Sequence, residues 1–266
     1  MPLRKKPYTI TFFYDLAFEK FPKMYPESFS KLKRESRNSA ETSNAILSVS
    51  DSTKKDLIKF YKTGVKKIRV SYPGVSKKFK AAGKKYKSKN PYFLFVGSLK
   101  KTKNVPGIIK AFHYFLKKSG LNFDLYIAGG DKWFDNEIRQ VSKNTLGSSV
   151  KFLGFVEEDK LASLYRGATA FVSPSFYEGF GLPMLEAMKS GCPVISSKSG
   201  SVPEVVENAG ILVNPNSQKE IGEAMITITR NLKKRTSLVN RGLKRAEDFS
   251  WIRFAEDVMD LINKRR

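Results

Sequence analysis

Two glutamates and the glycine-rich turn between them are the residues of this chain best suited to do chemistry. Residues 171–197 read FVSPSFYEGFGLPMLEAMKSGCPVISS, with Glu178 before the turn and Glu186 eight positions later. Glycines let backbone amides approach a diphosphate closely, and a helix that begins near Pro183 adds the positive end of its dipole. Because carboxylates repel phosphate, we expect both glutamates to accept hydrogen bonds from hydroxyl groups. A nucleotide sugar carries such hydroxyls on both sides of its diphosphate.

Other reactive residue types give no competing site in the sequence. No group of His, Cys, Asp or Glu has metal-ligand spacing, so we expect no metal and no cofactor. The only histidine, His113, falls in a predicted helix and is interpreted as a packing or surface residue. The only cysteine, Cys192, is interpreted as a small core residue, and a single cysteine suits a reducing cytoplasm.

Alternating strands and helices must position the turn. Apolar runs predict strands over 92–97, 123–129, 150–155, 169–174, 193–197 and 210–213. Helices are predicted over 104–118, 134–146, 157–166, 182–190, 201–208, 217–230, 235–247 and 251–263. Strands that are apolar throughout and alternate with helices indicate a parallel sheet covered on both faces. The fold class is therefore α/β, with one complete doubly wound, Rossmann-like domain.

The first third of the chain predicts a smaller unit. Its strands are expected over 8–13, 45–49 and 67–71, with a helix over 51–62 capped by Ser50. Three strands bury little apolar area, and we expect one edge of this sheet to be unpaired.

We divide the chain into four parts. These are a partial N-terminal Rossmann-like domain over 1–75, a basic linker over 76–90, the complete domain over 91–250, and a C-terminal helix over 251–266 expected to cross back to the N-terminal part.

The chain resembles the retaining glycosyltransferases of family 4, which have the two-domain GT-B fold, from about residue 7 to its C-terminus. The resemblance rests on EGFGLPMLEAM, GCPVI and SVPEVV, and on FVGSLKKTKN at 95–104. It implies that the complete domain binds a nucleotide-sugar donor. It also implies that Glu186 holds the ribose hydroxyls, while Glu178 contacts the donor sugar.

The same resemblance implies further roles in catalysis and donor binding. Lys103 would contact the diphosphate, which makes Glu178 and Lys103 the predicted catalytic residues. The remaining predicted donor-binding residues are Gly179, Phe180, Gly181 and Leu182 in the turn, Gly97 and Ser98 at the first strand end, and Gly154, Phe155 and Val156 beside the nucleotide base. Some relatives carry an arginine at the position of Ser98 or Thr102, and Lys100 or Lys101 is the alternative source of that charge.

The N-terminal part departs from the family in two ways. Tyr14, in TFFYDLAF, stands where relatives often carry a histidine near the transferred sugar, and it is a predicted cleft residue. Relatives also have a longer N-terminal half. The alternatives are a truncated chain, a separate polypeptide that supplies the missing half, or a protein that no longer catalyses.

Positive charge is the most unusual bulk property. The formal net charge is +24, and residues 1–90 hold 23 Lys and Arg against 7 Asp and Glu. Such a balance attracts phosphate-rich partners, including an anionic membrane surface. We expect a cytoplasmic protein peripheral to the inner face of the cell membrane. Apolar residues from Phe18 to Leu32 alternate with cations, which suggests shallow membrane insertion; the alternative is that these residues pack into the small N-terminal core.

Three functions compete at this point. The first is a hexosyltransferase that moves a sugar, with mannose favoured through the resemblance, from a nucleotide diphosphate to a lipid-linked or polysaccharide acceptor with retention. The second is a non-catalytic nucleotide-sugar-binding subunit. The third, a basic nucleic-acid-binding protein, lacks a recognised module, so we expect no nucleic acid as partner.

Overall fold

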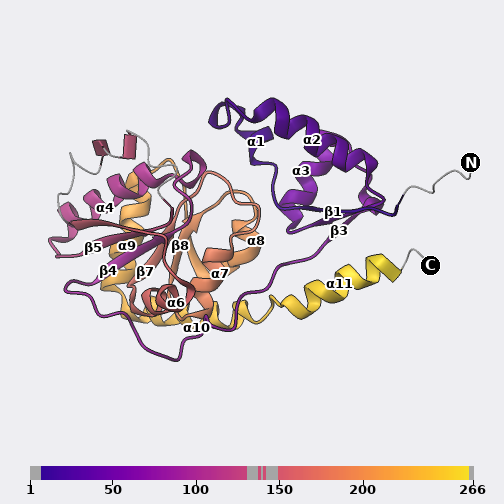
Figure 1. Ribbon diagram of the computed structural model, residues 1–266. Helices are drawn as coiled ribbons and strands as arrows, with labels where there is room; N and C mark the ends of the chain where they lie inside the picture. The colour runs from indigo at the N-terminus through magenta and orange to yellow at the C-terminus, as the bar shows by residue number, and fades with distance from the viewer. Residues whose placement is uncertain (1–6, 131–136, 139, 142–148, 264–266) are drawn as a thin grey trace, which may run out of the picture. The chain divides into compact units, whose positions relative to one another are not determined.

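The computed structural model describes residues 7–130, 137–138, 140–141 and 149–263, and these fold into two compact units (Figure 1). Unit 1 comprises Met1–Gly74, Glu178–Phe180 and Phe249–Arg266, and unit 2 comprises Val75–Tyr177 and Gly181–Asp248. Both units contain parallel sheets with helices, which confirms the α/β fold class. The helix predicted over 134–146 lies largely outside the described residues.

A six-stranded parallel sheet forms the centre of unit 2. Its strands stand in the order β6-β5-β4-β7-β8-β9. Their bounds are β4 Tyr92–Val96, β5 Asp124–Ala128, β6 Val150–Gly154, β7 Ala170–Ser173, β8 Val194–Ser197 and β9 Gly210–Val213. All six strands were predicted from their apolar runs. Such runs are expected where both faces of a sheet are buried, and every residue of β5, β7 and β8 is buried.

Helices cover both faces of this sheet. Their bounds are α4 Val105–Ser119, α6 Glu158–Gly167, α7 Leu182–Lys189, α8 Val202–Val206, α9 Gln218–Arg230 and α10 Leu232–Ala246. α4 and α9 contribute to one core with Phe93, Phe95 and Phe112. The alternate strand residue Tyr92 points to the other face, where its hydroxyl donates to the Leu164 carbonyl of α6 at 2.7 Å.

The segment predicted as a linker, 76–90, contains no regular helix or strand and is counted with unit 2. Phe79 is buried, and its ring meets that of Tyr165 at 5.8 Å in an edge-on arrangement. The amide of Tyr86 donates to the Ser163 carbonyl at 2.9 Å. The Phe79 ring and the Tyr86 backbone thus attach this otherwise polar and basic segment to the rest of unit 2.

Unit 1 is built on a three-stranded parallel sheet in the order β1-β2-β3. The strands are β1 Ile10–Phe13, β2 Ala45–Ser48 and β3 Ile68–Val70, and the helices are α1 Ala17–Lys20, α2 Phe29–Thr42, α3 Asp51–Tyr61 and α11 Trp251–Asn263. Ser50 caps α3 as predicted, because its hydroxyl accepts from the Thr53 amide at 3.0 Å. Short 3-10 turns over Pro22–Met24 and Val65–Lys67 complete the unit.

The structure corrects the expectation that the aromatics between residues 18 and 32 insert into a membrane. Phe18 is buried in the core of unit 1, and Tyr25, Phe29 and Leu32 pack against that core while partly buried. Phe29 and Leu32 lie on helix α2, which the sequence did not predict, whereas Phe18 lies on α1 and Tyr25 follows the Pro22–Met24 turn. The α2 cations Lys31, Arg34 and Arg37 are exposed. The alternative of core packing is therefore the better description of these residues.

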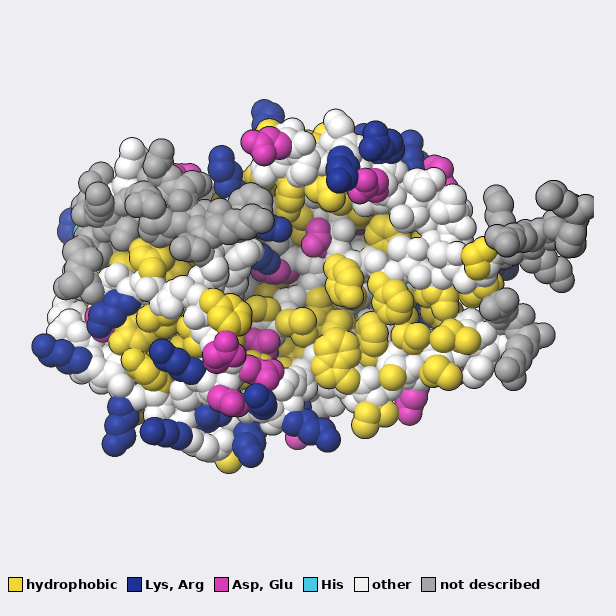
Figure 2. Space-filling model, in the orientation of Figure 1, with side chains coloured by type: hydrophobic (Ala, Val, Ile, Leu, Met, Phe, Trp, Pro, Cys, Tyr) yellow, Lys and Arg dark blue, Asp and Glu magenta, His cyan; other side chains and the backbone are white. Residues whose placement is uncertain are grey.

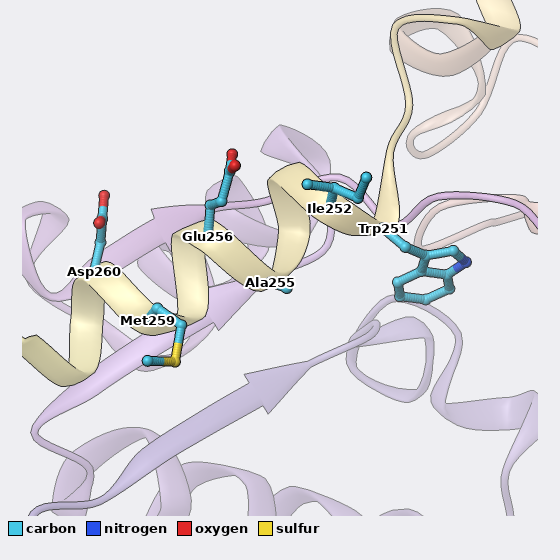
Figure 3. Close-up of a pocket in the computed structure, with 6 residues that line it drawn as sticks. All are labelled: Trp251, Ile252, Ala255, Glu256, Met259 and Asp260. Carbon is cyan, nitrogen blue, oxygen red and sulfur yellow. The ribbon is translucent and has the colours of Figure 1, made fainter.

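Helix α11 crosses one face of the unit 1 sheet. Phe254 meets Phe12 of β1 with ring centroids 6.0 Å apart, and Arg69 of β3 forms ion pairs with Asp257 and Asp260. An apolar stripe of α11 stays exposed, including Ile252 at 70% and Met259 at 54% (Figure 2). A shallow pocket beside the helix is lined by Trp251, Ile252, Ala255, Glu256, Met259 and Asp260 (Figure 3). Among the described helices, none is long and apolar enough to cross a membrane.

Candidate functional site

The strand order of unit 2 identifies the edge where a ligand would bind. From β4 the chain adds β5 and β6 on one side of the sheet, and then β7, β8 and β9 on the other. The order therefore switches between β4 and β7, which pair in parallel. In open parallel sheets, ligands bind outside the carboxyl ends of the strands at such a switch point. The loop after β4 carries Gly97, Ser98 and Lys103, and the loop after β7 leads to Gly181 and Glu186.

Asn104 joins these two loops. It follows the 3-10 turn Lys101–Lys103 in a left-handed conformation, with a φ of 57°. Its side-chain amide donates to the carbonyl of Pro174 at 3.1 Å and to that of Pro215 at 2.7 Å. The Phe176 amide also donates to the Thr102 carbonyl at 2.8 Å. Half-buried Lys103 is thus carried on a turn fixed against the carboxyl end of β7.

Gly181 is the N-cap residue of α7. Its φ of 104° is a conformation that glycine adopts and L side chains rarely do. The Met184 amide already donates to the Gly181 carbonyl at 3.0 Å, and Pro183 has no N–H. Within the described chain, the amides of Gly181 and Leu182 therefore make no hydrogen bond to protein. Two backbone donors at the positive end of an eight-residue helix suit an anion.

Glu186 lies on α7, four residues beyond Leu182, and is half-buried. Its Oε2 accepts a hydrogen bond from the Tyr165 hydroxyl at 3.0 Å. Burial raises the pKa of the Glu186 carboxyl to about 7, an effect that the Tyr165 hydrogen bond opposes and the charge of Glu158 reinforces. Oε1 has no protein partner in the described chain. Oε1 can therefore accept a hydrogen bond from a ligand hydroxyl.

The end of β6 supplies the predicted base-binding segment. Gly154 has a φ of 64°, and its carbonyl accepts from the Gly129 amide at 2.8 Å. Phe155 follows with 79% of its surface exposed, and Val156 is half-buried. An exposed aromatic ring at the carboxyl end of a strand offers a flat surface to a nucleotide base.

The other predicted residues are counted with unit 1. Tyr14 is 67% exposed, but its backbone carbonyl lies so close to Gly179 that a Cβ at that position would collide with it. The Thr53 hydroxyl lies 3.3 Å from the Tyr14 carbonyl and 3.4 Å from the Gly179 carbonyl. The ring of Phe180 stacks on that of Tyr72. Glu178 precedes this tightly held dipeptide in the chain.

Sequence reasoning missed Asn104, Tyr165 and Thr53 as supports of these residues. Asn104 directly before Val105-Pro106 is a helix-start signal, but its side chain makes no capping hydrogen bond, and its bonds to the Pro174 and Pro215 carbonyls depend on the tertiary fold. Nothing in the sequence marks Tyr165 or Thr53. Their hydroxyls contact the Glu186 carboxyl and the Gly179 carbonyl, and only the tertiary fold brings these groups near them.

Known proteins include several that are similar to this chain in sequence. The chain is 30% identical over 253 residues to O-antigen chain mannosyltransferase B of Escherichia coli, an alignment that covers 91% of this chain and 66% of the relative. It is 32% identical over 214 residues to O-antigen chain mannosyltransferase RfbU of Salmonella typhimurium, covering 78% of this chain and 58% of the relative. The chain thus spans 58 to 66% of the length of these two relatives.

Solved structures show the same fold. Anabaena Alr3699/HepE, determined in complex with UDP-glucose, superimposes with a TM-score of 0.80 at 19% identity, covering 96% of this chain and 72% of that one. The likeness confirms the GT-B fold class. The sequence profile described as Glycosyl transferases group 1 matches residues 76–245, a range that includes Lys103, Gly181 and Glu186. The chain therefore belongs to the group 1 glycosyltransferase family.

Proposed function

We propose that this chain binds a nucleoside-diphosphate sugar at the carboxyl edge of β4 and β7 and transfers the sugar to a lipid-linked or polysaccharide acceptor, with retention at the anomeric carbon. The observation that carries the proposal is the switch in strand order between β4 and β7, with the loop that carries Lys103 after β4 and the helix that carries Glu186 after β7. The two relatives named as O-antigen mannosyltransferases favour mannose as the hexose. An O-antigen is a polysaccharide, which favours a glycan acceptor.

Each part of the donor has a matching group in this proposal. The ribose hydroxyls donate to Glu186, whose Oε1 has no protein partner in the described chain. The amides of Gly181 and Leu182, together with the cation of Lys103, neutralise the diphosphate. Phe155 and its neighbours border the base, and Glu178 with Gly179 and Phe180 contacts the sugar.

Transfer with retention then needs no histidine. The acceptor hydroxyl attacks the anomeric carbon on the face that the diphosphate leaves, so a C–O bond to the acceptor forms as the C–O bond to phosphate breaks. The leaving phosphate oxygen takes the hydroxyl proton. Lys103 and the two amides stabilise the charge that develops on the diphosphate, which is a task for preorganised donors. Exposed Tyr14, in the histidine position, remains a residue of the acceptor side in this proposal.

We propose no metal for this reaction, because backbone amides and a lysine can carry the phosphate charge. A site that depended on Mg²⁺ would need oxygen ligands for it. We also place the protein in the cytoplasm, at the inner face of the membrane when the acceptor is lipid-linked.

Calorimetry on a variant tests the donor site. Glu186→Ala should weaken the binding of UDP or GDP by about 1–3 kcal/mol, because the ribose hydroxyls lose their acceptor. Glu223→Ala is the matched control, since Glu223 is an exposed glutamate of the same unit whose partner is Tyr114. Unchanged affinity in Glu186→Ala would contradict the assignment. Loss of binding in EDTA, restored by Mg²⁺, would contradict the metal-free site.

A second candidate is a binding subunit without transferase activity. The observation in its favour is that Lys103, Gly181 and Glu186, the residues proposed to bind the nucleotide, all belong to unit 2. Such a subunit would bind the nucleotide sugar with the Glu186 dependence described above and yet release no nucleoside diphosphate from it. Incubation with GDP-mannose or UDP-glucose in the presence and absence of a polysaccharide or lipid-linked acceptor, followed by quantification of free GDP or UDP, separates the two candidates.

A further inference from the structure

We propose that Tyr165 is a positioning residue for the donor site, which holds the Glu186 carboxyl in its ionised, ribose-accepting orientation. The proposal rests on the proposed function, because it assigns Glu186 to the ribose. It begins from the one hydrogen bond that the Glu186 side chain makes with the described chain, from the Tyr165 hydroxyl to Oε2 at 3.0 Å.

Tyr165 itself has almost no freedom to move. The residue lies on α6, none of its surface is exposed, and its ring is enclosed by two edge-on aromatic contacts. The centroid of Phe79 is 5.8 Å away and that of Phe171 of β7 is 5.7 Å away. Its hydroxyl is therefore a fixed donor, aimed from α6 at α7.

A fixed donor on one oxygen determines what the other oxygen can do. With Oε2 occupied by Tyr165, the carboxyl plane of Glu186 is set and Oε1 is left for the ligand. A carboxyl without this partner could rotate about its last side-chain bonds and would lose rotamer entropy when the ligand binds. Tyr165 thus reduces the entropic cost of donor binding without contacting the donor.

The same hydrogen bond selects the charged form of Glu186. The pKa of this carboxyl is raised to about 7, with burial as the main cause. The hydrogen bond from Tyr165 acts in the opposite direction, because it stabilises the ionised form. Glu158 of α6 raises the pKa further by charge repulsion. Buried Cys192, two residues before β8, raises the pKa of Tyr165 by charge, and Arg235 of α10 lowers the pKa of Cys192. Because the folded pKa lies above the usual carboxyl value, the ionised acceptor is lost as pH falls through about 7.

The substitution Tyr165→Phe removes the hydroxyl and keeps the packed ring. It should raise the pKa of Glu186, so more of the carboxyl is protonated at neutral pH. We expect about a fivefold loss of nucleotide-sugar affinity at pH 7, the equivalent of one ordinary hydrogen bond. The loss should shrink toward alkaline pH, where Glu186 ionises in the variant as well.

Calorimetry of UDP-glucose and GDP-mannose binding over about pH 5.5 to 8.5 measures this shift, since neither ligand carries a phosphate that titrates in that range. The wild-type affinity should rise through about pH 7, and the midpoint should move upward in Tyr165→Phe. Tyr92→Phe is the matched control, because Tyr92 is equally buried in unit 2 and its hydroxyl donates to a backbone carbonyl instead. Thermal unfolding of each variant shows how much stability the lost hydroxyl costs.

The outcomes separate this inference from the function beneath it. A wild-type midpoint retained in Tyr165→Phe, with Glu186→Ala still impaired, would overturn the positioning role and leave the donor site intact. An unimpaired Glu186→Ala would overturn the donor site itself. The same shift in Tyr92→Phe would attribute the effect to packing and contradict the role of Tyr165.

Discussion

Two glutamates eight positions apart have different surroundings in this protein. Glu186 belongs to unit 2, on a helix, with a fixed tyrosine donor on one oxygen. Glu178 belongs to the short stretch Glu178–Phe180, which is counted with unit 1 and is followed by a glycine that admits no side chain beside Tyr14. We therefore keep the prediction that the two carboxylates have different roles.

This difference predicts unequal effects on two ligands. Glu178→Ala should weaken the binding of a nucleotide sugar about tenfold, while leaving the bare nucleoside diphosphate within about twofold, because only the former offers sugar hydroxyls to that carboxylate. Parallel calorimetric titrations of GDP and GDP-mannose, or of UDP and UDP-glucose, measure both values. Equal losses for both ligands would contradict the division of roles.

At the residue scale, the sequence identified candidates but not their supports. Gly181 and Glu186 were chosen from motif spacing and Lys103 through the family resemblance, and the fold places the segments that carry them on the two sides of one switch point. Their roles stay predictions. Tyr165 was not chosen, because a buried tyrosine needs some partner and the sequence does not say which one. That choice depends on how α6 packs beside α7.

Secondary structure elements with apolar residues on both faces were predictable. All six strands of unit 2 were found from runs such as YFLFV and DLYIA, because buried parallel strands leave few polar positions. Helix α2, FSKLKRESRNSAET, was not found. It has one buried residue, Ala40, and it attaches to the core through the partly buried Phe29 and Leu32. Because so few apolar residues of α2 contact the core, the charged residues around them hide the helical pattern in the sequence.

Because Phe29 and Leu32 pack against the core, α2 would bind a membrane through the charges of its cations rather than by insertion. We expect the protein to sediment with anionic vesicles and not with neutral ones, and to be released by salt, since each cation near such a surface contributes about 1 kcal/mol. Changing Lys31, Lys33, Arg34 and Arg37 to serine should weaken that binding.

A matched variant controls for the loss of bulk charge. Lys84, Lys85, Lys87 and Lys89 are exposed cations of the 76–90 segment, and changing them to serine removes the same charge from unit 2. Its binding should stay closer to that of the unmodified protein. Equal weakening in both variants would mean that α2 has no special part, and equal binding to neutral vesicles would rule out the electrostatic route.

At the scale of the whole molecule, the two units differ in how completely their apolar surfaces are buried. Unit 2 has a six-stranded sheet whose core lies between helices, whereas unit 1 has three strands and an exposed apolar stripe on α11. A small three-stranded sheet was expected from the sequence. The stripe was not, because the spacing of Ile252, Ala255, Met259 and Ile262 in α11 is also that of a helix whose apolar face is buried.

The most direct test of the account is a crystal structure of the chain with UDP or GDP, whichever binds more tightly in solution. We expect the diphosphate against the amides of Gly181 and Leu182 and near the Lys103 ammonium group. A ribose hydroxyl should lie within hydrogen-bond distance of Glu186 Oε1, and the base should lie beside Phe155. A nucleotide bound away from the carboxyl ends of β4 and β7, or a ribose that does not contact Glu186, would contradict the proposed donor site.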